Sequence, residues 1–199
     1  MRPCRIPAPW VALGVDPDIL RDKSTSHPDN QAQIPERPVT PTERNDCIRR
    51  YAEGPTLLTE ALAAVPEAAL QWRPAPGKWS VHEIIVHCAD SETNSHMRVR
   101  YLIGESSPTI VGYDQDRWAT AMDYHAHPIE PAMATVTAVR ANTVPLLRRL
   151  TPEHWERRGK HSESGTYGVE EWLEIYAEHL EIHVRQIARV LEAWKARKD

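Results

Sequence analysis

The sequence predicts an all-α protein built as a four-helix bundle, with one or two short extra helices. Apolar residues recur every three or four positions in four long stretches, which is the period of one helix face. No segment shows a convincing alternation of apolar and polar residues, as a half-buried strand would. The stretches cover residues 42 to 65, 81 to 104, 130 to 150 and 169 to 195. Long amphipathic helices bury their apolar faces against one another, which favours a bundle.

Local signals mark the second helix most clearly. Ser80 stands three residues before Glu83, and this Ser-x-x-Glu pattern ahead of an apolar run is a capping box. We therefore expect the helix to begin at Val81 and to end near Gly104. Its apolar stripe is interrupted at mid-length by polar residues at helical spacing, and such an interruption suggests a cavity. These polar residues are Ser91, Glu92 and Ser95.

Other segments are expected to precede or connect the helices. Residues 1–41 are rich in proline and polar residues, which predicts a poorly ordered tail ahead of one domain, residues 42–199. The connection from 105 to 128 is irregular, apart from an expected short helix over 114 to 122. Residues 159 to 168 are predicted to form a turn-rich connection.

Composition excludes several classes of function. The net charge of −4 comes without a basic stripe, so nucleic acid is not an expected partner. No apolar run is long enough to span a membrane, and the short one from Ala8 to Val15 is broken by Pro9 and Gly14. The three cysteines form no Cys-x-x-Cys pair, which fits a reducing cytoplasm. Cys88 is expected to be a packed apolar thiol.

Two histidines on the last helix are candidate metal ligands. His179 and His183 are four residues apart, so they lie on one side of the helix and border its apolar face. His87, beside the polar interruption of the second helix, is the best third donor, because an open catalytic zinc site has three protein ligands. The spacing alone also fits ordinary core histidines. His82 points elsewhere on its helix and is expected near the surface or the helix cap.

The remaining histidines are expected to be solvated, because they lie in polar or loop contexts. They are His96, His125, His127, His154 and His161. The aromatic residues Tyr113, Trp118 and Tyr124 in the long connection could either line a pocket or cover the core.

Two segments resemble signatures of the DinB/YfiT-like metal-dependent superfamily. The first is PGKWSVHEIIVHCADSE, residues 76–92, and the second is YAEHLEIHVRQI, residues 176–187. The resemblance also includes Gly54-Pro55 and covers most of residues 42 to 196. It implies an up-down-down-up bundle in which His87, His179 and His183 hold one divalent metal ion, with zinc or nickel expected.

The resemblance also implies an enzyme that acts on a small molecule. Relatives include low-molecular-weight-thiol S-transferases and proteins described as hydrolases, so both thiol transfer, with such a thiol as cosubstrate, and hydrolysis fit. Gln186 and Asp90 are candidates to orient a histidine or a water, as is Glu83. A non-catalytic bundle with a structural metal or a stress-linked binding role is the alternative. A homodimer also remains open.

Overall fold

Four long helices form the protein, as the sequence predicts. The computed structural model describes residues 39–197, so nearly all of the predicted tail lies outside the described residues. The long helices are α2 (Pro41–Ala63), α3 (Val81–Gly104), α5 (Ile129–Leu147) and α7 (Val169–Ala196). Short helices, η2 (Glu67–Ala69), α4 (Gln115–Ala121) and α6 (Pro152–Trp155), lie in the connections.

Side-chain caps explain where the first two long helices begin. Ser80 Oγ accepts a hydrogen bond from the Glu83 backbone N–H, and the Glu83 carboxylate accepts one from the Ser80 backbone N–H. Thr40 and Glu43 form the same reciprocal pair ahead of α2. Each pair satisfies backbone donors that the first helical turn leaves unpaired. The predicted boundaries of α3, Val81 and Gly104, are therefore confirmed.

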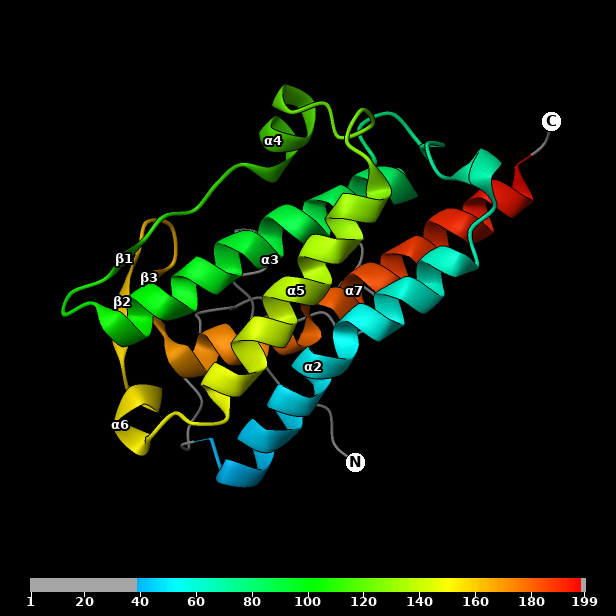
Figure 1. Ribbon diagram of the computed structural model, residues 1–199. Helices are drawn as coiled ribbons and strands as arrows, with labels where there is room; N and C mark the ends of the chain where they lie inside the picture. Colours follow the sequence, from blue (N-terminus) through cyan, green and yellow to red (C-terminus); the bar gives the residue numbers. More distant parts are fainter. Residues whose placement is uncertain (1–38, 198–199) are drawn as a thin grey trace, which may run out of the picture.

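The helix directions follow an up-down-down-up order (Figure 1). Arg44 contacts Glu170 and Arg50 contacts Glu181, so α2 and α7 run in the same direction. Contacts of Glu92 with Arg140 and of His96 with Thr143 show that α3 and α5 are also parallel to each other. Trp172 donates to the backbone oxygen of Ser95, whereas His179 contacts Glu92, so α7 runs against α3.

A small β-sheet corrects the expectation that the chain has no strands. β2 (Arg158–His161) and β3 (Gly165–Gly168) pair antiparallel, and β1 (Thr109–Ile110) pairs parallel to β2. The predicted turn-rich connection is thus a hairpin. Its turn places Gly165 at φ 78°, a conformation that glycine adopts without strain. These strands are too short to show an alternating pattern.

The third long helix is shorter than predicted. It ends at Leu147 rather than at Leu150, and α6 begins at Pro152 soon afterwards. Thr151 precedes a proline, which disfavours helical backbone at that residue. It has an extended conformation and caps α6 instead.

The core consists of two apolar clusters. One includes Leu102, Leu147 and Trp172, at the end of the bundle that holds the sheet, and the other includes Leu58 and Ile85. On α3 and α5, the inward residues between the two clusters are polar yet buried: Ser91, Glu92, Ser95, Arg98, Arg140 and Thr143. The bundle therefore carries a polar layer at mid-length, where the sequence predicted polar side chains on α3.

Gly54 on α2 leaves room for Arg140 in this layer. A Cβ atom at position 54 would lie 2.4 Å from Arg140 Nη1 and 3.0 Å from Leu180 Cδ1. The absence of a side chain is therefore required by the close approach of a buried guanidinium rather than by backbone conformation.

Replacing Gly54 with Ala should lower stability, although alanine is the better helix former. We expect a loss of about 1–3 kcal/mol from overpacking, which corresponds to a thermal midpoint lower by roughly 2–10 °C. Thermal unfolding followed by circular dichroism measures this. Gly104→Ala is the matched control, because nothing lies within 4 Å of a Cβ there. Equal midpoints for the two variants would contradict the close-approach argument.

Candidate metal centre

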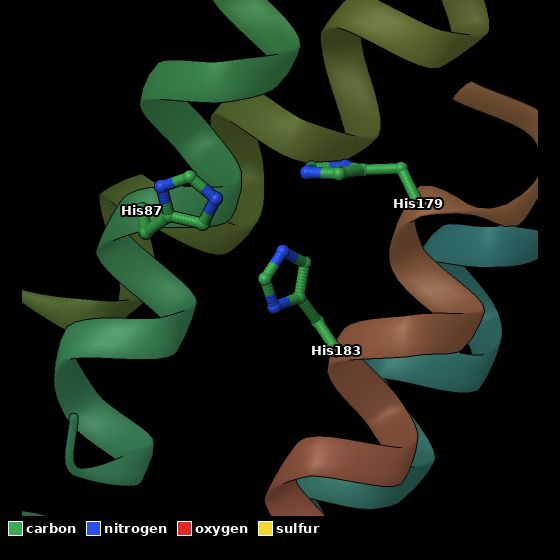
Figure 2. Close-up of side chains that lie close together, drawn as sticks. All are labelled: His87, His179 and His183. Atoms are coloured by element: carbon green, nitrogen blue, oxygen red, sulfur yellow. The ribbon is translucent and has the colours of Figure 1, made fainter. Parts of the chain in front are cut away.

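Helices α3 and α7 bring the three predicted histidines together (Figure 2). His179 and His183 are one turn apart on α7, and His87 faces them from α3. The ring centroid of His87 lies 5.8 Å from that of His179 and 4.9 Å from that of His183, and the other two are 4.7 Å apart. One ligand atom from each ring lies within 4.8 Å of the others. The rings thus converge on one point.

Burial keeps two of these rings neutral. At most 1% of the surface of each of the three histidines is exposed. Burial and the neighbouring rings of His183 and His179 hold the pKa of His87 well below its usual value. Burial and His179 lower the pKa of His183 to about 3, although its hydrogen bond with Gln186 opposes the shift. A neutral imidazole is the form that binds a metal.

The donor set fits a divalent cation. Nε2 of His179, Nε2 of His183 and both ring nitrogens of His87 are buried and have no hydrogen-bond partner in the described part of the chain. Buried polar atoms are normally paired. A single ion between the rings would give each of them a partner, and imidazole nitrogen is a preferred ligand of zinc and nickel.

Glu92 orients the His179 ring. Its Oε1 atom lies 3.1 Å from His179 Nδ1, which leaves Nε2 to face the other histidines. Burial alone would raise the pKa of Glu92, but Arg140 and His179 outweigh it and hold that pKa well below its usual range. The carboxylate is therefore ionised and accepts the Nδ1 proton. This is the carboxylate–histidine arrangement that fixes the tautomer in metal sites.

Arg140 holds Glu92 in place and joins all four long helices. From α5, it donates to Glu92 Oε1 on α3 at 2.6 Å. It also donates to the backbone oxygen of Tyr51 on α2 at 2.7 Å and to the backbone oxygen of Tyr176 on α7 at 2.9 Å. Its guanidinium also lies 4.1 Å from the centroid of the Tyr51 ring. The position of Glu92 therefore depends on the assembled bundle.

Gln186 orients the second α7 histidine. Its Oε1 atom lies 2.9 Å from His183 Nδ1, so Nδ1 carries the proton and Nε2 is free to bind an ion. The sequence analysis named Gln186 for this position because it follows His183 by about one turn.

The other two acidic candidates lie in different surroundings. Asp90 accepts a hydrogen bond of 2.5 Å from the Tyr124 hydroxyl. Glu83 caps α3 and forms an ion pair with Arg73. The structure gives each carboxylate a partner other than the three histidines.

His82, which was expected near the surface or the helix cap, is the second residue of α3 and is buried, and His161, which was expected to be solvated, is buried as well. His82 is 8% exposed, and its Nε2 atom lies 2.7 Å from the backbone oxygen of His127. His161 is 5% exposed and packs against the ring of Tyr167 in the hairpin. Neither burial was visible in the sequence, because His82 is covered by the distant connection that carries His127, and the hairpin that holds His161 and Tyr167 is too short to show a period.

The aromatic residues of the long connection cover α3. Tyr113 packs on Trp118, with ring centroids 4.3 Å apart, and Tyr124 is buried against Asp90. Cys88 is fully buried in the apolar cluster that also holds Ile85, and burial raises the pKa of its thiol well above the usual value. It is thus a packed core residue, as predicted.

Sequence reasoning missed Arg140 and the specific role of Glu92. Arg140 lies four residues after Val136 and four before Val144, both of which are buried. A charged residue on an otherwise apolar helix face was therefore the available signal. The role of Arg140 depends on its partner carboxylate, Glu92, which lies on another helix.

Comparisons with known proteins show the family and the fold of this chain. The sequence profile of the DinB superfamily matches residues 50–187. A protein of Oceanobacillus iheyensis named "Putative metal-dependent hydrolase" is 33% identical over 155 residues, which cover 78% of this chain and 87% of that protein. A Bacillus cereus protein of the same name is 27% identical over 151 residues, which cover 76% of this chain and 87% of that protein.

A solved structure shares the fold. YfiT from Bacillus subtilis, described as "a probable metal-dependent hydrolase with an unusual four-helix bundle topology", superposes with a TM-score of 0.75 at 23% identity. The match covers 82% of this chain and 94% of YfiT. Since the profile spans more than half of the sequence and the Oceanobacillus relative aligns along most of its length, the chain belongs to the DinB superfamily.

Proposed function

We propose that the protein is a metal-dependent hydrolase of a small molecule, with His87, His179 and His183 as the ligands of one divalent ion, zinc or nickel. The observation that carries the proposal is the convergence of buried ring nitrogens from three histidines, which lack hydrogen-bond partners within residues 39–197. The names of the relatives support hydrolysis as the reaction. In the described residues no helix is long and apolar enough to cross a membrane.

The number of donors favours a catalytic ion over a structural one. Within residues 39–197, the group that could hold an ion consists of three histidines without a fourth His, Cys, Asp or Glu. Structural zinc sites are usually closed by four protein ligands, whereas catalytic sites keep one position open. Three neutral ligands also leave the full positive charge of the ion available to a substrate.

The chain's own groups hold and orient the ligands. A divalent ion bound there would lower the pKa of a bound water and polarise a carbonyl or phosphoryl oxygen. Glu92 accepts the Nδ1 proton of His179, and Gln186 accepts that of His183, so both rings present Nε2. The apolar residues of α3 and α7 exclude bulk water and strengthen these interactions.

Replacing His179 or His183 with Ala should remove most of the bound metal, because two donors hold an ion weakly. Elemental analysis of protein purified without chelator measures this. His82→Ala serves as the control and should keep the metal, with a lower thermal midpoint because His82 is buried. Stoichiometric metal in the His179→Ala and His183→Ala variants would rule out the assignment.

The same variants test the reaction. Zinc-loaded wild-type protein should hydrolyse members of an ester and amide panel, and both alanine variants should lose at least about 100-fold in kcat/KM, of the order seen when a key catalytic group is removed. Turnover that occurs only when a low-molecular-weight thiol is present would instead assign thiol transfer. A loaded protein that is inert in both assays would make the metal structural.

Gln186→Ala should weaken metal binding without removing it. Loss of a group that orients a ligand typically costs about 10–100-fold in metal affinity. Competition with a chromophoric chelator gives the affinity. Arg189→Ala, an exposed change on the same helix, should leave the affinity unchanged. Equal affinity in both variants would exclude an orienting role for Gln186.

The lowered histidine pKa values predict that the metal-free protein loses stability in acid. His87 and His183 stay neutral when folded but take up protons in the unfolded chain as the pH falls below the ordinary histidine pKa of 6.5. Their contribution to stability is therefore fully present above that pH and is lost as the pH falls, towards about 3 for His183. From pH 6.5 to 5.5 each ring should cost about 1 kcal/mol.

Urea unfolding of EDTA-treated protein at the two pH values measures this loss. His183→Gln cannot take up that proton, so its loss should be smaller than that of the wild type by about 1 kcal/mol. An identical loss in both proteins would show that His183 is charged in the folded state.

A further inference from the structure

Arg98 is a buried cation without an acidic partner. It is 5% exposed and lies on α3 in the mid-bundle polar layer. Nη1 donates to the Tyr176 hydroxyl at 3.2 Å, and Nη2 donates to the backbone oxygen of Val111 at 2.9 Å. Nε is buried and unpaired. Within residues 39–197, no carboxylate lies within ion-pair distance of this guanidinium.

This arrangement is unusual for a guanidinium, because arginine does not lose its proton inside a protein. A buried charge is costly unless it is paired. Arg140, in the same layer, meets that requirement through Glu92. Arg98 has only neutral acceptors, so its surroundings lack one negative charge that a bound anion would supply.

Unpaired hydroxyl groups gather around the same guanidinium. The Arg98 guanidinium carbon lies 5.9 Å from the centroid of the Tyr113 ring. The Tyr113 hydroxyl and Ser91 Oγ are buried and lack hydrogen-bond partners in the described chain. Ser91 Oγ lies near the hydroxyls of both Tyr113 and Tyr176, without the geometry of a hydrogen bond to either. Three donor side chains are therefore available to one oxyanion: Arg98, Ser91 and Tyr113.

These donors lie next to the candidate metal centre. Ser91 follows His87 by four residues on α3, a distance of about 6 Å along the helix. On α7, the Tyr176 ring lies 5.5 Å from that of His179, and Tyr176 contacts Arg98 directly. A molecule bound by Arg98 would thus extend along the interface of α3 and α7 towards the three histidines.

We infer that Arg98, Ser91, Tyr113 and Tyr176 form a subsite for an oxyanion, a carboxylate or a phosphate, of the substrate. The inference rests on the proposed function and narrows it to small anionic molecules whose reacting group lies a few atoms from the anion. Guanidinium and hydroxyl donors together are suited to such groups, because charge-assisted hydrogen bonds are the strongest available.

Calorimetric titration of the full-length protein tests the subsite. The probes are succinate, inorganic phosphate and the neutral analogue succinamide, each added to EDTA-treated and to zinc-loaded protein. At least one anion should bind the EDTA-treated protein, and succinamide should not. The anion that binds more tightly identifies a carboxylate or a phosphate as the preferred group.

Three variants assign the binding to these residues. Arg98→Met should weaken binding of the anion about 10–100-fold, as expected for the loss of hydrogen bonds to a charged group. Its thermal midpoint should not fall, because an uncompensated charge is removed. Tyr113→Phe should weaken binding of the anion about 3–10-fold, since the hydrogen bond of a neutral donor is lost. Arg100→Met, two residues along α3 and bonded to Asn142, is the matched control and should bind as the wild type does.

Several results would overturn the subsite. One is the absence of anion binding to the wild-type protein, and another is an equal affinity for the anion in the wild type and Arg98→Met. The third is binding that requires zinc and has the same affinity in Arg98→Met. If Arg98→Met fails to fold, Tyr113→Phe replaces it in this comparison. An anion affinity equal to that of the wild type would then overturn the subsite. Failure of the wild type to hold either zinc or nickel would reject the proposed function. The titration of EDTA-treated protein would still be readable, so the two failures are distinguishable.

Discussion

The buried ion pair of Arg140 and Glu92 is the interaction on which the centre of the bundle depends. Arg140 lies on α5 and donates hydrogen bonds to the other three long helices, and Glu92 orients the His179 ring through its hydrogen bond with Nδ1. Removing either partner alone would leave an uncompensated charge in a water-free interior, which is strongly destabilising. The same contact therefore contributes to the alignment of the helices and to the geometry of the histidines.

This pair also explains two other features of the bundle. Gly54 lacks a side chain where the guanidinium passes α2. The apolar core is divided into two clusters because polar groups from α3, α5 and α7 occupy the layer between them. An entirely apolar layer would pack at lower cost, since buried polar groups must each find a partner. The layer is therefore best understood as a site rather than as a source of stability.

Within the layer, satisfied and unsatisfied polar groups have different roles. Glu92, Arg140 and Gln186 have partners inside the protein, so they position other groups. Nε2 of His179 and His183, both ring nitrogens of His87, Arg98 Nε and the hydroxyls of Ser91 and Tyr113 lack such partners in the described residues. A cation between the histidines and an anion beside Arg98 would satisfy them with opposite charges. That division is a physical basis for binding a polar, charged small molecule.

The sequence alone indicated the helices and the histidine pair of α7, because both depend on local spacing, whereas His87 was predicted from the polar interruption of α3 and from the family resemblance. Helical periodicity and the capping box placed α3 from Val81 to Gly104, and the four-residue interval placed His179 and His183 on one side of α7. Gln186 was predicted because it follows His183 by three residues, about one helical turn. The tertiary structure decided the rest. The hairpin that holds His161 and Tyr167 is too short to show a period. Arg140 is paired with a carboxylate on another helix, and His82 contacts the backbone of His127 in a distant connection. Such contacts join residues far apart in the chain, and no local pattern encodes which residues will meet.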